Sequence, residues 1–346
     1  MSMHRTIARY TTETSRQEHH IIYMYTGSPA VALLSMLTLL LLALSMSAST
    51  HAEEARRVPF ADPFILLHDG NYYAYGTLAA DGIAVMTSSD LLHWRENAGR
   101  AKGALALHKD DSYGEKWFWA PEVYRVGDKF HMYYSADEHV CVAVADSPLG
   151  PFVQKEKKPL VSDEKAIDNT LFVDDDGQPY MFFSRFNDGL NIWSVEMEAD
   201  RLRVRPEMLR YCVRAWQPWE RREGRVNEGA FVLKHRGRYY LTYSGNGYTS
   251  HDYGIGCAVA DSINGPWRKC DNNPLLQRCG GLVGVGHHSF FRDREGRLRI
   301  VFHAHNSTTQ IHPRHMYIGS ASFQEEPDGA PRLVISQEFI VPVIDE

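Results

Sequence analysis

The stretch ADPFILLHDGNYYAYGT, residues 61–77, has a form that the chain repeats four more times. A polar residue opens a short apolar run, a glycine hairpin follows, and an aromatic-rich run comes after the hairpin. The other copies are APEVYRVGDKFHMYYSA (120–136), IDNTLFVDDDGQPYMFFSR (167–185), NEGAFVLKHRGRYYLTYSG (227–245) and GHHSFFRDREGRLRIVFHAH (286–305). Because the hairpins recur every 50 to 60 residues and every copy carries strand signals, the repeat predicts a β-propeller.

A further alternating strand follows each copy. CVAVADSPLGPF (141–152) and GCAVADSINGPW (256–267) share the run AVADS and a later Gly-Pro-aromatic, which is strong internal evidence of repetition. Period-two alternation dominates, and sustained helical periodicity is absent outside the N-terminal apolar run. The sequence therefore predicts an all-β, five-bladed propeller, in which residues 332–343 supply closing strands that pair with the first blade.

Length and charge set limits on the kind of protein. The chain has 346 residues, a formal net charge of −6 and no basic block, so nucleic acid is not an expected partner. Aromatic residues make up 12% of the chain. Most of them suit strand packing, and some of them suit sugar rings. We expect one catalytic propeller domain over residues 53–346.

The first 52 residues have the features of a targeting segment. The run from Pro29 to Ala48 carries no charge, and Thr50-His51-Ala52 is a small-residue cleavage signal. We predict a signal peptide cleaved after Ala52, and hence a secreted or periplasmic protein. The run is also long enough to span a bilayer, so an uncleaved anchor is the alternative.

The five cysteines show no zinc-ligand spacing. Cys270 and Cys279 flank a short loop and are candidates for a disulfide in an oxidising compartment. The odd number leaves at least one free thiol.

Carboxylates stand at the strand starts of four copies. Hydrolysis of a glycosidic bond needs one carboxylic acid to protonate the departing oxygen and one carboxylate on the opposite face. Asp62 and Glu228, from non-adjacent blades, suit the roles of base and acid. Asp168, one blade before Glu228, would raise the pKa of Glu228 by like-charge proximity. Glu122 takes the equivalent position in the second copy, where its flanks favour a structural or sugar-hydroxyl role.

The five stretches together resemble the blade signatures of glycoside hydrolase family 43, in the expected order over residues 58–325. The resemblance implies a five-bladed propeller that hydrolyses arabinose-, xylose- and sometimes galactose-containing saccharides with inversion. It also implies that Asp62 is the general base, Glu228 the general acid and Asp168 the carboxylate that tunes and orients the acid. Fructan chemistry is disfavoured, because Ala61-Asp62-Pro63 stands where the related fructosidases carry Asn-Asp-Pro.

Three further residues are candidates for the site. Trp119 is a candidate sugar platform, with blade packing as the alternative. Arg314 resembles a family arginine that reaches substrate or base, and otherwise it is an exposed strand-end arginine. His287 resembles a histidine at the channel axis that holds calcium through ordered waters in several members. Calcium prefers oxygen ligands, so a metal-free, water-filled axis is the alternative, and the register leaves open whether His287 or His288 faces inward. No cofactor is expected for the chemistry itself.

The resulting hypothesis is an inverting glycosidase that removes terminal α-L-arabinofuranosyl or β-xylosyl units from plant polysaccharides or oligosaccharides. The alternatives are an endo-arabinanase, an exo-galactosidase, and a propeller that binds sugars without turnover.

Overall fold

The computed structural model describes residues 55–161, 164–326 and 331–345. The apolar run and the predicted cleavage site lie outside the described residues, so the targeting segment stays a prediction. Within the described ranges, no helix has the length and apolar character needed to cross a membrane.

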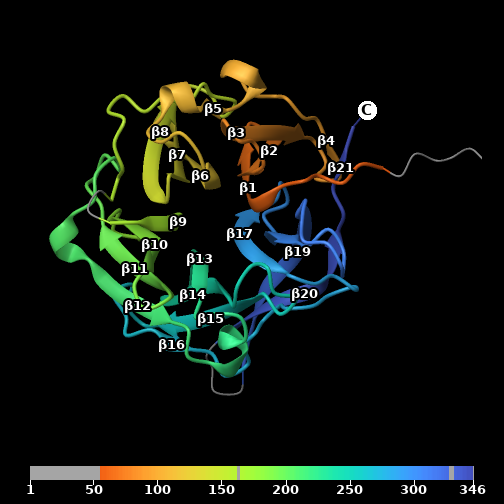
Figure 1. The fold of residues 1–346 in the computed structure, drawn as a ribbon. Helices are drawn as coiled ribbons and strands as arrows, with labels where there is room; N and C mark the ends of the chain where they lie inside the picture. The colour runs from red at the N-terminus through yellow and green to blue at the C-terminus, as the bar shows by residue number, and fades with distance from the viewer. Residues whose placement is uncertain (1–54, 162–163, 327–330, 346) are drawn as a thin grey trace, which may run out of the picture. The chain divides into compact units, whose positions relative to one another are not determined.

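The described residues form five antiparallel sheets arranged around a centre, which confirms the predicted five-bladed propeller (Figure 1). In each blade the first strand lies innermost and the chain proceeds outward by hairpins. Blade 1 contains β1 (Ala61–His68), β2 (Asn71–Thr77), β3 (Gly82–Ser88) and β5 (Leu107–His108). Blade 2 contains β6 (Trp119–Val126), β7 (Lys129–Ala136) and β8 (His139–Ala145). Blade 3 contains β9 (Ala166–Val173), β10 (Pro179–Phe186), β11 (Leu190–Glu196) and β12 (Arg210–Arg214).

The last two blades have four strands each. Blade 4 contains β13 (Asn227–His235), β14 (Arg238–Gly245), β15 (Gly254–Ala260) and β16 (Arg268–Lys269). Blade 5 contains β17 (Gly286–Arg292), β18 (Leu298–Ala304), β19 (His315–Gln324) and β20 (Arg332–Ile340). Single turns of 3₁₀ helix lie in the connections: η1 (Lys102–Ala104), η2 (Lys109–Asp111), η3 (Pro206–Met208) and η4 (Pro218–Arg221).

A short parallel pair closes the ring. β21 (Val343–Ile344) pairs with β4 (His93–Trp94), an outer strand on blade 1. The Ile344 amide also donates to the Arg56 carbonyl at 2.8 Å. The C-terminal stretch therefore does close the ring onto the first blade, as predicted, but most of it forms β20 in blade 5 and two residues make the strand contact.

The hydrophobic core lies between neighbouring sheets. One buried cluster joins blades 1 and 5 around Trp94, another joins blades 3 and 4 around Trp219, and a third joins blades 2 and 3 around Phe183. Alternate residues of each strand face these interfaces, as the period-two pattern requires. Each fully buried aromatic or aliphatic side chain contributes about 1.5–3 kcal/mol.

Each inner strand begins with a β-bulge, and the bulge sets which side chains face the axis. The pairing register shifts near the start of β1, β6, β9, β13 and β17. One residue at each bulge has positive φ, and these residues are Asp62, Ala120, Asp168, Gly229 and His287. Bulges of this kind re-aim side chains next to active sites. The repeat thus brings five equivalent backbone positions to one end of the channel.

This register corrects two sequence-based assignments. Ala120, and not Glu122, is the blade 2 counterpart of Asp62, because the bulge falls two residues earlier than the repeat suggested. Glu228 precedes the bulge residue Gly229 by one position, and it pairs with Ser244 as Ala61 pairs with Thr77 in blade 1. Acid and base candidates therefore occupy neighbouring, non-identical positions of the repeat.

Hydrogen bonds between blades support these bulges. At four junctions the amide of the bulge residue donates to a side chain at the end of the preceding blade's second strand. The pairs are Ala120 to Thr77 Oγ1 (3.0 Å), Asp168 to Ser135 Oγ (3.1 Å), His287 to Ser244 Oγ (2.8 Å) and Asp62 to His303 Nδ1 (3.1 Å). In four of the five copies, the polar residue near the end of the aromatic-rich run therefore links neighbouring blades.

Candidate active site

A cavity of about 690 Å³ opens at the bulged end of the inner strands and is lined by all five blades. Of the residues predicted from sequence, it brings together Asp62, Trp119, Asp168, Glu228, His287 and Arg314. The three carboxylates are buried, each less than a tenth exposed. Charged groups held this far from water are costly unless they are paired or protonated, so their partners decide their charge state.

Polar groups surround the Asp62 carboxylate. Arg314 donates to Oδ1 at 3.1 Å and Thr77 Oγ1 donates to Oδ2 at 2.6 Å. The Nδ1 atoms of His287 and His303 lie 3.3 and 3.4 Å from Oδ1, and that of His303 accepts the Asp62 amide. Burial alone would raise the pKa of Asp62, but Arg314 and then the two histidines and Thr77 hold it well below its usual range. Asp62 is therefore ionised at any physiological pH.

Asp168 and Glu228 have the opposite tendency. Burial first, and then the negative charges of Glu228 and Asp62, raise the pKa of Asp168 well above its usual range. Burial also raises the pKa of Glu228 to about 7, with the charge of Asp62 adding to it and a hydrogen bond from Tyr253 opposing it. Two adjacent buried carboxyls share protons as a pair, so this side of the cavity stays protonated while Asp62 is charged.

The Asp168 carboxylate also contacts the backbone of blade 4. The amide of Gly229, the bulge residue next to Glu228, lies near this carboxylate and favours its ionised form. The side chain expected to accept this amide is Ser184, which ends the second strand of blade 3. Its buried hydroxyl has no hydrogen-bond partner among the described residues. Asp168 has thus replaced the inter-blade link at the one junction that carries Glu228.

Gly229 suits this bulge better than the residues of the other four would. Its φ is +57°, and a Cβ there would lie 3.2 Å from ring atoms of His287. Glycine adopts the left-handed conformation at the lowest cost and leaves the His287 ring its place. The Asn-Glu-Gly motif therefore allows the bulge that places Glu228 in the cavity.

Arg314 projects into the cavity from just before β19. Its guanidinium lies over the Tyr248 ring, 4.6 Å from the centroid, and its Nη1 is 3.2 Å from His303 Nε2. The side chain is only about a tenth exposed. Arg314 is thus a site residue and not an exposed strand-end arginine.

The two adjacent histidines of blade 5 point to different surroundings. His287 lines the cavity, and its Nδ1 is 4.0 Å from Asp168 Oδ2 as well as close to Asp62. His288 is buried on the other side, where its Nε2 lies 2.7 Å from Thr242 Oγ1. Burial lowers the pKa of His287, so the imidazole is neutral at pH 7. The structure therefore resolves the register in favour of His287.

The surroundings of His287 do not form a metal cage. Within the described residues, no group of three or more histidine, cysteine or acidic side chains is placed to hold a metal ion. Calcium takes six to eight oxygen ligands, and the His287 Nδ1 atom already faces Asp62. An ion held chiefly by water, which the family resemblance implied, stays a prediction, and we assign no chemistry to it.

Glu122 does not line the cavity. Its carboxyl accepts a hydrogen bond from Tyr124 Oη at 2.5 Å, and burial raises its pKa to about 8. A neutral, buried carboxyl bonded to a neighbouring strand residue fits the structural role better than contact with a sugar hydroxyl. Trp119 does line the cavity, and its ring stacks on Trp117 with centroids 5.6 Å apart.

Three contacts of the carboxylates were not anticipated from sequence. Thr77 and His303 bind Asp62, and Tyr253 Oη donates to Glu228 Oε1 at 2.7 Å. Thr77 and His303 close the second strands of their blades, so comparing the ends of the aromatic-rich runs would have found them. Tyr253 lies in the connection before β15 and carries no repeat signal.

Comparisons with known proteins agree with this geometry. Residues 57–331 match the model of the glycosyl hydrolases family 43. The chain is 27% identical over 277 residues to the β-D-galactofuranosidase XynD of Aspergillus niger, covering 73% of this chain and 76% of that protein. It is 24% identical over 304 residues to the extracellular exo-α-(1→5)-L-arabinofuranosidase ArbA of Cellvibrio japonicus, covering 77% and 84%.

Among solved structures, an endo-1,4-β-xylanase from Bacteroides thetaiotaomicron superimposes with a TM-score of 0.78 at 43% identity, covering 85% of this chain and 99% of that one. A five-bladed propeller with three carboxylates in one cavity defines the class, a glycoside hydrolase. The chain belongs to glycosyl hydrolase family 43.

Proposed function

We propose that the protein is an inverting glycosidase that removes terminal arabinofuranosyl or xylosyl units from plant polysaccharides or oligosaccharides. The observation that carries this proposal is the split in charge state within one cavity. Asp62 is held ionised by Arg314, whereas the pKa of Glu228 is raised to about 7. A base that stays ionised and an acid that stays protonated are the two groups that single displacement by water requires.

In the proposed reaction, Asp62 accepts a proton from a water molecule as that water attacks the anomeric carbon. Glu228 donates its proton to the departing glycosidic oxygen, and the bond between the anomeric carbon and that oxygen breaks. Asp168 acts through Glu228, by sharing its proton and by holding the Gly229 amide beside it. Arg314 positions Asp62, and Trp119 offers a ring face to the sugar.

The sugar identity draws support from the named relatives. They include a galactofuranosidase, an arabinofuranosidase and a xylanase, so each of the sugars concerned is a furanose, a pentose or both. Endo action on a xylan or arabinan is the second candidate, because the 43%-identical structure is that of an endo-1,4-β-xylanase. Extracellular names among the relatives and the N-terminal apolar run support action outside the cytoplasm.

A screen on aryl glycosides tests turnover and sugar identity together. The panel contains α-L-arabinofuranoside, β-D-xylopyranoside, β-D-galactofuranoside and β-D-galactopyranoside, with linear arabinan and xylan added for endo action. Release of aryl alcohol from the first or second supports the proposal. Proton NMR of the first-formed sugar must then show the inverted anomer, and a retained anomer would contradict Asp62 as base.

A further inference from the structure

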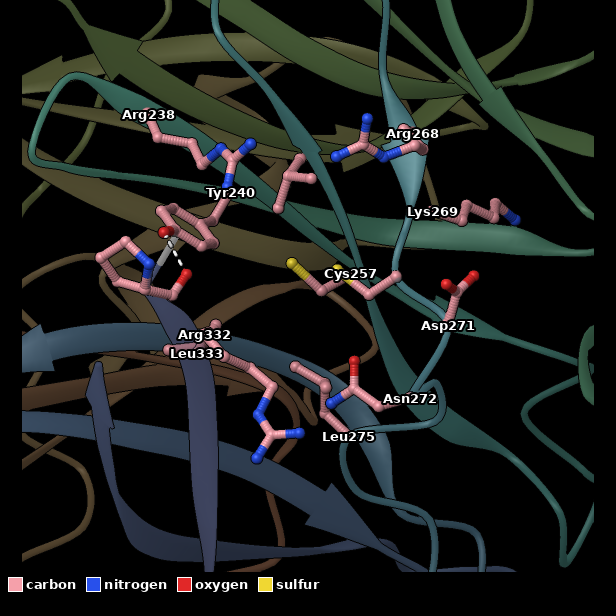
Figure 2. A pocket seen from close by; sticks show the side chains of 13 residues that line it. Arg238, Tyr240, Cys257, Arg268, Lys269, Asp271, Asn272, Leu275, Arg332 and Leu333 are labelled. Atoms are coloured by element: carbon pink, nitrogen blue, oxygen red, sulfur yellow. Dashed lines mark hydrogen bonds between the residues drawn. The ribbon is translucent and has the colours of Figure 1, made fainter. Parts of the chain in front are cut away.

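A small hollow on blade 4, of about 180 Å³, contains two thiols and shares no lining residue with the candidate active site. Cys257, from β15, lies in it beside Tyr240 and Arg268 (Figure 2). Cys270, the residue after β16, lines the same hollow. We propose that Cys257 and Cys270 form a redox-active pair that closes to a disulfide bond across the outer edge of blade 4.

The strand register places the two residues opposite each other. β15 and β16 are antiparallel, with Ala258 opposite Lys269 and Val259 opposite Arg268. One step further along this register, Cys257 faces Cys270, and the Cys270 amide donates to the Cys257 carbonyl at 2.9 Å. Directly opposite residues in an antiparallel pair have Cα atoms about 4.5–5.5 Å apart, which lies within the range that a disulfide spans.

The ladder opens at this pair, which leaves the backbone free to adjust. The Cys257 amide donates to Asn273 Oδ1 instead of to Cys270, and the Cys270 carbonyl accepts from Gln217 Nε2 at 3.1 Å. Both residues line the same hollow, and the Cys257 thiol donates to the carbonyl of Ala258 at 3.6 Å. The pair is thus held together without a full ladder contact that bond formation would have to break.

The two thiols differ in reactivity. Cys257 is only 1% exposed, and the neighbouring Cys270 side chain and burial raise its pKa well above the usual range. Cys270 is partly exposed, and the neighbouring Cys257 side chain, together with Arg268 and Arg238, lowers its pKa against the opposing effects of burial and Asp271. A thiolate beside cationic groups is the form that attacks a disulfide, so Cys270 is the attacking sulfur and Cys257 the resolving one.

The oxidant we assign is a small acidic disulfide, for which oxidised glutathione is the probe. The Cys270 thiolate attacks one glutathione sulfur and releases the other glutathione as thiolate. Cys257 then loses its proton and attacks Cys270 Sγ, releasing the second glutathione. Two electrons and two protons pass from the protein to one oxidised glutathione, which leaves as two reduced molecules.

The disulfide bond would hold β16, a short strand whose Lys269 binds residues near the candidate active site. β16 contains only two residues, and its Lys269 is buried. The Lys269 ammonium donates to Glu220 and, at 2.7 Å, to Asn227 Oδ1, the residue before Glu228. Closing the pair ties this strand to β15, and so supports the wall behind the candidate acid. The sequence instead suggested Cys270 with Cys279, but both are free thiols in this structure, and Cys279 does not line the hollow that Cys270 shares with Cys257.

Peptide mapping tests the pairing directly. The folded, purified protein is incubated with oxidised glutathione, its remaining thiols are alkylated in denaturant, and it is digested with trypsin without reduction. Trypsin cuts after Arg268, Lys269 and Arg278, so the three cysteines fall in separate peptides. We expect the Cys257 and Cys270 peptides to be linked. Alkylation of both, a Cys270–Cys279 link, or glutathione left on Cys270 as the end product would overturn the proposal.

Variants separate pairing from folding. Cys279→Ser is the matched control, from the same connection, and should keep the linked peptides. Cys270→Ser should lose them and should show no change in melting temperature between oxidised and reduced samples. Oxidised wild type should melt roughly 3–10 °C above reduced wild type. Arg268→Ala should slow oxidation several-fold, because it removes a charge that favours the thiolate. Equal melting temperatures for both redox forms of the wild type would contradict the stabilising role.

Discussion

The junction between blades 3 and 4 differs from the other four junctions of the ring. Elsewhere the bulge amide binds a hydroxyl or imidazole of the preceding blade, as Asp168 binds Ser135. Between blades 3 and 4 the Gly229 amide lies beside the Asp168 carboxylate, and the Ser184 hydroxyl has no partner among the described residues. A repeated scaffold link has been replaced by a carboxyl at the point where Glu228 is held. The departure from the repeat marks the functional residues more sharply than the repeat does.

The largest loss of activity is expected from replacing either the proposed general base, Asp62, or the proposed general acid, Glu228. Asp62→Asn and Glu228→Gln should each lower kcat/KM by about 10³-fold, within the range that general acid–base groups contribute. Aryl glycoside hydrolysis measures this. Glu122→Gln is the matched control, because Glu122 is equally buried but lies outside the cavity. A loss in Glu122→Gln as large as in Glu228→Gln would contradict the assignment of roles.

A substitution of Asp168, at the junction between blades 3 and 4, should have the next largest effect on activity. Asp168→Asn keeps an oxygen that can accept the Gly229 amide but removes a carboxyl from the pair with Glu228. Repulsion between the two carboxylates disappears, so the pKa of Glu228 falls. The alkaline limb of kcat/KM, expected near pH 7 in the wild type, should shift to lower pH, and kcat should fall about 10²-fold.

The pH profile of Asp168→Asn is compared with that of Asp174→Asn, a carboxylate on the β9–β10 hairpin that binds Tyr239 Oη at 2.6 Å. That control should leave the alkaline limb in place. An unmoved limb in Asp168→Asn would mean that Asp168 does not tune the acid.

Tyr253→Phe should shift the same limb in the opposite direction. The Tyr253 hydroxyl donates to Glu228 Oε1 and stabilises the ionised form, which lowers the pKa of Glu228. Without this bond the pKa rises, so kcat/KM should stay high to a more alkaline pH, with kcat reduced several-fold. The pH dependence of kcat/KM checks this, and an unmoved alkaline limb would show that Tyr253 has only a packing role.

The smallest expected effect is on the free energy of unfolding, which should differ between a variant at a bonded junction and one at the junction of blades 3 and 4. Ser135→Ala leaves the buried Asp168 amide without its acceptor and should cost about 1–3 kcal/mol of unfolding free energy. Ser184→Ala removes a hydroxyl that has no partner, so it should change stability by less than about 0.5 kcal/mol. Urea unfolding of both variants makes the comparison. Equal losses would indicate that Ser184 is bonded in solution.

The repeat was sufficient to predict the blades and the three buried carboxylates that line the cavity. It located Asp62, Asp168 and His287 because each sits at the strand start that the pattern marks. It misplaced Glu122, since a bulge adds a residue that no hydrophobic alternation reveals. It also missed Tyr253, because a connection of irregular backbone places its side chain by tertiary packing alone. The positions of β-bulges and the side-chain positions of loop residues depend on tertiary contacts, which the sequence pattern does not reveal.

The parallel pair of β21 and β4 brings the first and last described residues of the propeller close together. Ile344 is hydrogen-bonded to Arg56, so residue 345 and residue 55 lie at one place on the ring. If these two ends were joined, the chain could be opened at another loop and the blades would keep the same spatial order around the axis. A circular permutant that joins these ends and opens at the Gly127 or Gly177 hairpin should rebuild the same cavity. By the same logic, deleting residues 343–346 should loosen the seam between blades 5 and 1, where Arg314 meets Asp62.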